Sequence, residues 1–211
     1  IGFGAFVDIS ITARQAYIEN IIRAQWSPRG DRLAVTSSRW QEQPQIYIIS
    51  PEGNLRAQLK IAGGWAQEIA WSPDGESIAY VDYLNNRICL ANREGPFRCL
   101  QQGAFSNSGP PSWSPDGARL AYCASITPPQ CDVYVTALEG GASFLVASDG
   151  YDPAWSPAGT WITFSACSPN GCLLHLARPA ACEQGTAGGL TAISSVGNVS
   201  HATWSPDGTR L

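Results

Sequence analysis

Trp71-Ser72-Pro73-Asp74-Gly75 is a five-residue stretch that recurs along this 211-residue chain and decides its fold. Copies of the pattern Trp-Ser-Pro-x-Gly begin at Trp26, Trp71, Trp113, Trp155 and Trp204, so successive tryptophans lie 45, 42, 42 and 49 residues apart. A period of roughly 40–45 residues is typical of a four-stranded β-propeller blade. The repeat therefore predicts an all-β propeller of antiparallel blades, with four complete blades and the start of a fifth.

The pattern itself predicts a tight turn between the first two strands of each blade. Proline presets φ for the second position of a type I turn, and glycine accepts a positive φ at its close. The fourth residue is Asp in three copies, whereas Arg29 and Ala158 replace it in the other two. A metal site shared by all blades would need a ligand in every copy. We therefore interpret the Asp as a turn residue and the Trp as an apolar body packed between blades, and we expect no metal and no cofactor.

Segments of strand length follow each turn at similar distances. In the first unit they are 33–35, 46–49 and 55–59, with the turn Pro51-Glu52-Gly53-Asn54 before the last. Blades are expected to start near residues 20, 65, 107, 149 and 198, which makes 20–211 the repeat domain. Residues 1–19 form an N-terminal segment.

The fifth unit stops three residues after its Gly208. Two interpretations follow: the chain is a fragment of a six- or seven-bladed propeller, or the segment 1–19 supplies outer strands of a neighbouring or closing blade. Residues 6–11 alternate as a strand does, and 16–19 could form a second one. A native polypeptide with a mass near 22.5 kDa would exclude the fragment.

The five copies, taken over residues 20–211, resemble the TolB-like β-propeller repeat. This relative of the WD-type repeat is found in TolB and in the propeller domains of prolyl-oligopeptidase-type peptidases. The resemblance implies a non-catalytic scaffold that binds a protein or peptide in the cell envelope or outside the cell. The alternative that it implies is the substrate-gating domain of a serine peptidase whose hydrolase domain lies outside this chain. A fold alone does not fix a function.

Charge and hydropathy exclude several partners. The net charge is −4 and Lys60 is the single lysine, so no basic stripe is available for nucleic acid and no polybasic patch for an anionic membrane. No run of about 18 apolar residues predicts a membrane span, and no signal peptide is visible. We expect a protein or peptide ligand, no nucleic acid and no direct membrane insertion of this chain.

Six of the seven cysteines fall into local pairs on the blade map. The expected pairs are Cys89 with Cys99, Cys123 with Cys131, and Cys167 with Cys172; Cys172 could instead pair with Cys182. Disulfides would place the chain outside the cytoplasm, in the periplasm, secreted, or anchored to the outer face of a membrane by a further segment. The competing interpretation is that these cysteines are small buried apolar residues.

Recognisable catalytic motifs are missing from the sequence. It contains no Gly-x-Ser-x-Gly elbow, no Gly-rich phosphate loop and no His-Glu-x-x-His. His175 aligns with a strand position that packs against neighbours. A third class, a metal-dependent propeller lyase, would need a His-rich cluster, but the chain has two histidines. We expect that this chain is not an enzyme.

A candidate binding site follows from counting back three residues from each motif Trp. This position starts the innermost strand near the mouth of the central channel, and it holds Arg23, Glu68, Pro110, Asp152 and His201. Four ionisable groups there predict a mixed-charge ring that binds a ligand, an ion or a peptide terminus. Alternatively, these loop ends pair only with one another.

Aromatic residues are expected on the same face. Trp40 and Tyr83 lie in the loops after the second strands of the first two units, and Trp65 lies just before an inner strand. An amphipathic aromatic side chain on a loop is a typical binding anchor. These side chains could equally cover neighbouring loops.

Overall fold

The computed structural model describes residues 20–38, 43–61, 65–92, 95–102, 109–125, 131–140, 142–168, 171–185, 190–193, 199 and 202–211. The strands expected within 1–19, together with Trp40 and His201, lie outside these described residues.

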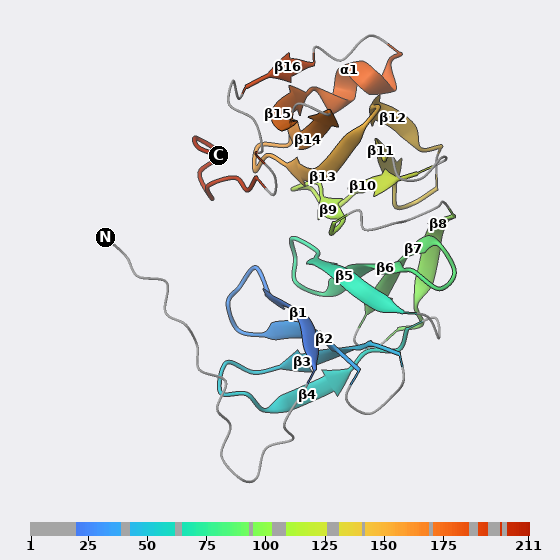
Figure 1. Ribbon diagram of the computed structural model, residues 1–211. Coiled ribbons are helices and arrows are strands. Elements are labelled where there is room, and N and C mark those ends of the chain that lie inside the picture. The colour runs from blue at the N-terminus through green and yellow to red at the C-terminus, as the bar shows by residue number, and fades with distance from the viewer. Residues whose placement is uncertain are drawn as a thin grey trace.

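Four antiparallel sheets of four strands follow one another along the chain (Figure 1). Blade 1 consists of β1 (Ile21–Trp26), β2 (Leu33–Ser37), β3 (Gln45–Ile49) and β4 (Leu55–Gln58). Blade 2 consists of β5 (Ala66–Trp71), β6 (Ser77–Asp82), β7 (Arg87–Asn92) and β8 (Arg98–Gln102). Blade 3 consists of β9 (Ser112–Trp113), β10 (Arg119–Ala124), β11 (Asp132–Ala137) and β12 (Phe144–Ala147). Blade 4 consists of β13 (Gly150–Trp155), β14 (Ile162–Ser168), β15 (Gly171–Ala177) and β16 (Thr191–Ala192).

The blades are arranged around an arc with their first strands innermost. In Figure 1, β1, β5, β9 and β13 lie along the inner side of the arc, and successive members of this set contact each other. Strands are paired in chain order within every sheet, as in a propeller blade. The expected fold class, an all-β propeller with four four-stranded blades and the start of a fifth, is confirmed.

Apolar side chains fill the interfaces between blades. Between blades 1 and 2, for example, Ile46 and Ile48 of β3 pack in one buried cluster with Ile69, Ile78 and Tyr80. Two further clusters join blade 2 to blade 3 and blade 3 to blade 4. Because side chains alternate across a strand, the central strands of blade 2 serve the interfaces with both blade 1 and blade 3, which explains their nearly continuous burial.

The Trp-Ser-Pro-x-Gly stretches form the expected turns. In blade 2 the Gly75 N–H donates to the Ser72 carbonyl oxygen at 2.9 Å, and Gly75 has a φ of 73°. The Ser72 hydroxyl donates to the Asp74 carboxylate, which also accepts the Glu76 N–H at 3.0 Å. The hydrogen bond from Ser72 lowers the pKa of Asp74. This carboxylate is thus a turn acceptor.

The motif tryptophans also hydrogen-bond between blades, which the sequence did not reveal. The indole N–H of Trp71 donates to the Gln25 carbonyl oxygen of blade 1 at 3.0 Å. Trp113 and Trp204 repeat this bond to the Ala70 and Ala154 carbonyl oxygens, at 3.0 and 3.2 Å. Each acceptor immediately precedes the Trp of the blade before. In these three copies the motif therefore joins consecutive blades by directed hydrogen bonds as well as by packing, whereas the buried Trp155 indole N–H has no hydrogen-bond partner among the described residues.

One element departs from the expected all-strand pattern. A five-residue helix, α1 (Pro179–Glu183), follows β15 in blade 4 and packs against β12 of blade 3. Proline at the start of the helix suits a position where the N–H would lack an intrahelical partner. In the described part of the chain, no helix combines the length and apolar character needed to span a bilayer.

Candidate functional site

The candidate site lies on the face of the propeller where the inner strands begin, which we call the mouth face. Connections between second and third strands emerge on the same face. Of the five positions counted back from the motif Trp, the structure describes Arg23 in β1, Glu68 in β5, Pro110 before β9 and Asp152 in β13.

Arg23 and Glu68 form an ion pair between blades 1 and 2. The Arg23 Nη2 and Nε atoms lie 2.8 and 3.2 Å from Glu68 Oε1. The Glu68 side chain is only 10% exposed, whereas that of Arg23 is 53% exposed. Hydrogen bonding to Glu68 and its negative charge raise the pKa of Arg23. The guanidinium thus neutralises a nearly buried carboxylate while presenting its own outer edge to solvent.

Irregular pairing occurs at the same place in three inner strands. The register shifts between Ile21 and Arg23 in β1, between Ala66 and Ile69 in β5, and between Tyr151 and Ala154 in β13. An extra residue in one strand bends it and redirects its side chains, and such bulges are common beside functional sites. Arg23, Glu68 and Asp152 all lie within or beside these irregularities.

Asp152 adopts a strained backbone conformation that Gly109 accommodates. Asp152 has a φ of 52°, and Gly109 has a φ of 70°. A Cβ atom on Gly109 would collide with the Asp152 carboxylate. Glycine therefore leaves room for this carboxylate at the start of blade 3. The Asp152 charge also contributes to the raised pKa of Arg23, so the two residues interact electrostatically on the mouth face.

Two of the predicted aromatic anchors lie next to each other. The Tyr83 N–H donates to the Trp65 carbonyl oxygen at 3.2 Å. Trp65 is 43% exposed, whereas Tyr83 is half-buried against the cluster between blades 2 and 3. Leu84 in the same turn and Ile21 and Ile22 at the start of β1 are also exposed. The exposure of these three aliphatic side chains could not be predicted from the sequence, because it depends on tertiary contacts.

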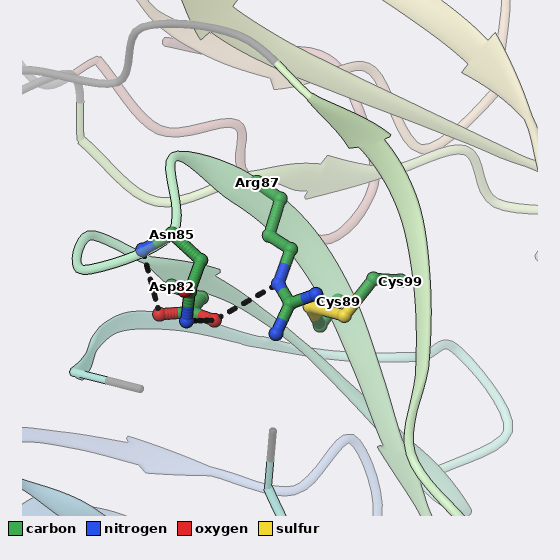
Figure 2. Close-up of a disulfide and its surroundings, with 5 residues drawn as sticks. All are labelled: Asp82, Asn85, Arg87, Cys89 and Cys99. Carbon is green, nitrogen blue, oxygen red and sulfur yellow. Dashed lines mark hydrogen bonds and ion pairs between the residues drawn. A yellow bond between two sulfur atoms is a disulfide. The ribbon is translucent and has the colours of Figure 1, made fainter. Parts of the chain in front are cut away.

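The turn that carries Tyr83 and Leu84 is held by a buried carboxylate (Figure 2). Asp82 has no exposed side-chain surface and accepts Arg87 Nε at 3.0 Å and Asn85 Nδ2 at 2.8 Å. The Asn85 N–H donates to the same carboxylate at 3.3 Å. The sequence signal was available, namely an Asp at the end of an apolar strand followed by Asn and Arg. A buried charge is retained when it is paired and hydrogen-bonded in this way.

Disulfides hold the corresponding connections in the next two blades. Cys123–Cys131 closes the connection between β10 and β11, and Cys167–Cys172 closes that between β14 and β15. Cys89–Cys99 joins β7 to β8 (Figure 2). The prediction of disulfides is confirmed. The alternative partner, Cys182, keeps its thiol, whose sulfur lies 3.8 Å from the Val146 carbonyl oxygen.

His175 occupies the packing position expected for it. It lies on β15 opposite Phe164, and the two rings stack with centroids 5.5 Å apart. Among the described residues, His, Cys, Asp and Glu side chains form no group of three that could hold a metal ion.

Comparison with known proteins gives one sequence relative and several solved structures. No protein-family model matches the chain. A 145-residue stretch, 67% of this chain, is 29% identical to an uncharacterized peptidase, YuxL of Bacillus subtilis, and covers 21% of that protein. This chain therefore spans about a fifth of the length of the relative.

Two TolB structures superpose closely on the fold. The putative TolB of Agrobacterium tumefaciens matches with a TM-score of 0.66 and 20% identity, covering 83% of this chain and 62% of that one. TolB of Acinetobacter baumannii matches with a TM-score of 0.69 and 17% identity, covering 89% of this chain and 47% of that one. The chain thus has a TolB-like β-propeller fold.

Proposed function

We propose that this chain is a non-catalytic propeller that binds a protein or peptide at its mouth face. The observation that carries the proposal is the Arg23–Glu68 ion pair, whose exposed guanidinium lies between the mouth ends of blades 1 and 2. Trp65 and Leu84 expose apolar surface on the same side of blade 2. Exposed aromatic and apolar side chains next to an arginine are typical of the centre of a protein-binding surface.

The construction of the mouth face supports binding by a preformed surface. Asp82 holds the turn of blade 2, and disulfides join the strands at the two ends of the equivalent connections in blades 3 and 4. A cross-linked connection has less conformational entropy to lose on binding, so more of the contact energy appears as affinity.

The same disulfides support a location outside the cytoplasm. Three disulfides in one chain fit an oxidising compartment, because cytosolic reductants keep most thiols reduced. The TolB-like fold adds support for an envelope or extracellular scaffold, as the repeat pattern implied. We therefore place the binding function in the periplasm or outside the cell.

Selection of peptides from a random library tests the proposal. Peptides that the wild-type chain retains should bind Trp65→Ala and Leu84→Ser variants at least about tenfold more weakly. Leu145→Ser is the matched control, because Leu145 is a similarly exposed leucine on the outer strand β12. Equal weakening by Leu145→Ser, or undiminished binding by both mouth variants, would refute binding at this face.

A second candidate is favoured by the similarity to the peptidase YuxL. In this case the chain is the gating propeller of a larger peptidase, and the mouth face orients peptide substrates toward a hydrolase domain. Joining the chain to such a domain should make Trp65→Ala raise KM for long peptides and leave KM for a dipeptide substrate unchanged. An equal change for both substrates would contradict gating by the mouth face.

A further inference from the structure

A cavity of about 300 Å³ lies between blades 1 and 2, away from the mouth face. Its polar rim comes from residues beside three turns on the opposite face, two in blade 1 and one in blade 2. Asp31 and Arg32 follow the first turn of blade 1, Arg56 follows the second, and Glu76 follows the motif turn of blade 2. This cavity therefore belongs to a different surface from the site described above.

The floor of the cavity is apolar. Ile48 of β3, Trp71 of β5 and Ile78 of β6 line it, together with Leu59 just after β4. All four side chains are buried. The volume is on the order of that of ten water molecules, which suits a ligand of roughly ten non-hydrogen atoms. An apolar body of this size would replace water on the floor of the cavity.

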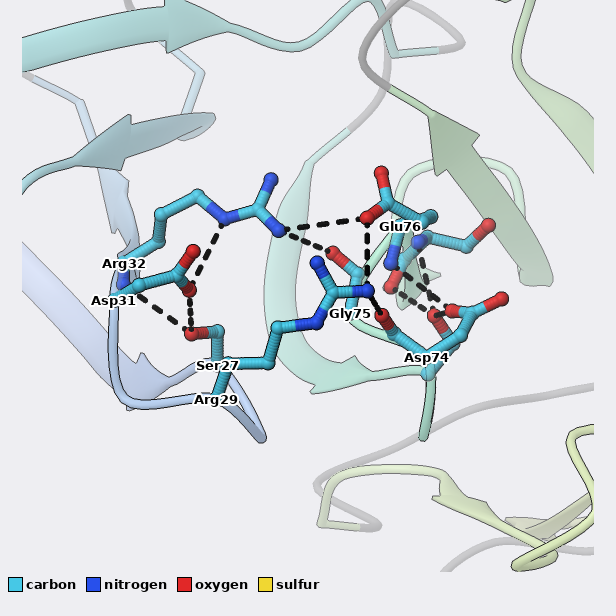
Figure 3. Close-up of polar contacts among 9 residues, drawn as sticks. Ser27, Arg29, Asp31, Arg32, Asp74, Gly75 and Glu76 are labelled. Carbon is cyan, nitrogen blue, oxygen red and sulfur yellow. Dashed lines mark hydrogen bonds and ion pairs between the residues drawn. The ribbon is translucent and has the colours of Figure 1, made fainter.

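Three of the four charged groups at the rim already pair with one another (Figure 3). Arg32 lies 3.3 Å from Asp31 and 3.6 Å from Glu76, and it also donates to the Gly75 carbonyl oxygen at 3.1 Å. Its guanidinium lies 5.6 Å from the centre of the Trp71 ring. Arg29 provides Glu76 with a second cation at 3.4 Å. The two carboxylates are thus matched by arginines.

Arg56 is the remaining charge at the rim, and its side chain is exposed. Within the part of the chain that the structure describes, no hydrogen bond or ion pair within 4 Å engages its guanidinium. The pKa of the exposed Glu52 is lowered first by a hydrogen bond from Ser50, and the charge of Arg56 adds to this lowering from a distance. The rim therefore offers one guanidinium that can take an anion, above an apolar floor.

We propose that this cavity binds a small carboxylate with an apolar body, with the carboxylate on Arg56 and the apolar part on Leu59, Ile48 and Trp71. A guanidinium and a carboxylate are both planar and can form two parallel hydrogen bonds with each other. An apolar carboxylic acid of this size can make that bidentate contact with Arg56. The carboxylate can belong to a free aromatic or aliphatic acid or to the last residue of a polypeptide. Both sources present the same chemistry to the cavity.

Titration followed by NMR tests this proposal on the full chain. The indole N–H resonance of Trp71 reports the cavity, and the probe is 3-phenylpropanoate. We expect 3-phenylpropanoate to shift this resonance in a saturable way. The amide 3-phenylpropanamide should bind at least about tenfold more weakly, because it lacks the charge. A tripeptide Gly-Gly-Phe with a free C-terminus forms the second arm, and its C-terminal amide is the control.

Variants make the test specific to Arg56. Arg56→Gln should weaken binding about tenfold or more, whereas Lys60→Gln, which removes a cation outside this cavity on the same outer edge of blade 1, should leave it within about twofold. Ala57→Phe should fill the cavity and prevent the shift, with an unchanged melting temperature as the check on folding. If 3-phenylpropanoate binds more tightly than Gly-Gly-Phe, the natural ligand is a free acid, and the reverse order indicates a polypeptide C-terminus.

The proposal would be overturned if neither probe shifts the Trp71 resonance, or if wild type and Arg56→Gln bind with equal affinity.

Discussion

Arg23 Nη2 lies 2.8 Å from Glu68 Oε1, and this contact joins the inner strands of blades 1 and 2 at the mouth face. The two partners differ strongly in exposure, because the Glu68 side chain is almost enclosed while half of the Arg23 side chain meets solvent. The Arg23–Glu68 ion pair therefore affects the stability of the propeller as well as its proposed binding surface.

Removing Arg23 should cost more stability than removing the charge of Glu68. Arg23→Gln leaves a nearly buried carboxylate without its cation, which we expect to lower the free energy of unfolding by about 1–2 kcal/mol. Glu68→Gln leaves a guanidinium that water can solvate, so its cost should stay below about 1 kcal/mol. Urea unfolding of both variants measures the difference. Equal losses of unfolding free energy, or a larger loss for Glu68→Gln, would contradict the view that Glu68 depends more on its partner than Arg23 does.

Gly109→Ala should destabilise the chain and disturb Asp152. The new Cβ would collide with the Asp152 carboxylate, in addition to the strain of a positive φ. Gly185→Ala is the matched control, since Gly185 has the same φ of 70° and nothing within 4 Å of its Cβ position. We expect a loss of about 1 kcal/mol for the control and about 2–3 kcal/mol for Gly109→Ala, measured by urea unfolding. Equal losses would show that Asp152 does not depend on Gly109.

Ala158→Asp should stabilise blade 4. In blades 2 and 3 the corresponding Asp74 and Asp116 accept a hydrogen bond from the motif serine, at 2.5 Å in each case. Ser156 has no such acceptor at position 158, although its oxygen accepts the Trp161 N–H at 3.1 Å. Restoring the carboxylate should add about 0.5–1.5 kcal/mol to the free energy of unfolding. A thermal scan that shows a lower melting temperature would contradict this interpretation of the turn.

Stability should fall in acid because of the same carboxylates. Hydrogen bonds from the motif serines lower the pKa values of Asp74 and Asp116, and they lower that of Asp207 to about 2. Their contribution is complete above the unfolded pKa of about 3.9 and is lost as the pH falls through the lower folded values. Unfolding free energy should therefore decline between about pH 4 and pH 2. Asp74→Asn should reduce the slope in this window, and an unchanged slope would exclude the Ser72–Asp74 bond as a cause.

The sequence predicted the parts of this structure that depend on local chemistry. Five copies of Trp-Ser-Pro-x-Gly specified the turns, the blade period and the position of the inner strands. Counting from these turns placed Arg23 and Glu68 at equivalent positions in adjacent blades, which is where the structure brings them together. Two cysteines at the two ends of the same connection between strands likewise predicted the disulfide that joins them.

Features that depend on tertiary contacts could not be predicted in this way. Gly109 of blade 3 leaves space for Asp152 of the adjacent blade 4, a full repeat further along the sequence, and no local pattern encodes this contact. Arg29 looked like the loss of a turn residue, but it reaches the Asp74 carbonyl oxygen of the next blade at 2.8 Å. The cavity beside Arg56 likewise exists only after blades 1 and 2 have packed.

Site-specific photo-cross-linking tests the proposed binding function most directly. A photoreactive residue is placed at position 65 or 84 on the mouth face, and at 145 as an exposed control elsewhere. In cells that produce the protein, we predict that positions 65 and 84 form the same discrete adduct and that 145 does not. An adduct from 145, with none from 65 and 84, would contradict binding at the mouth face.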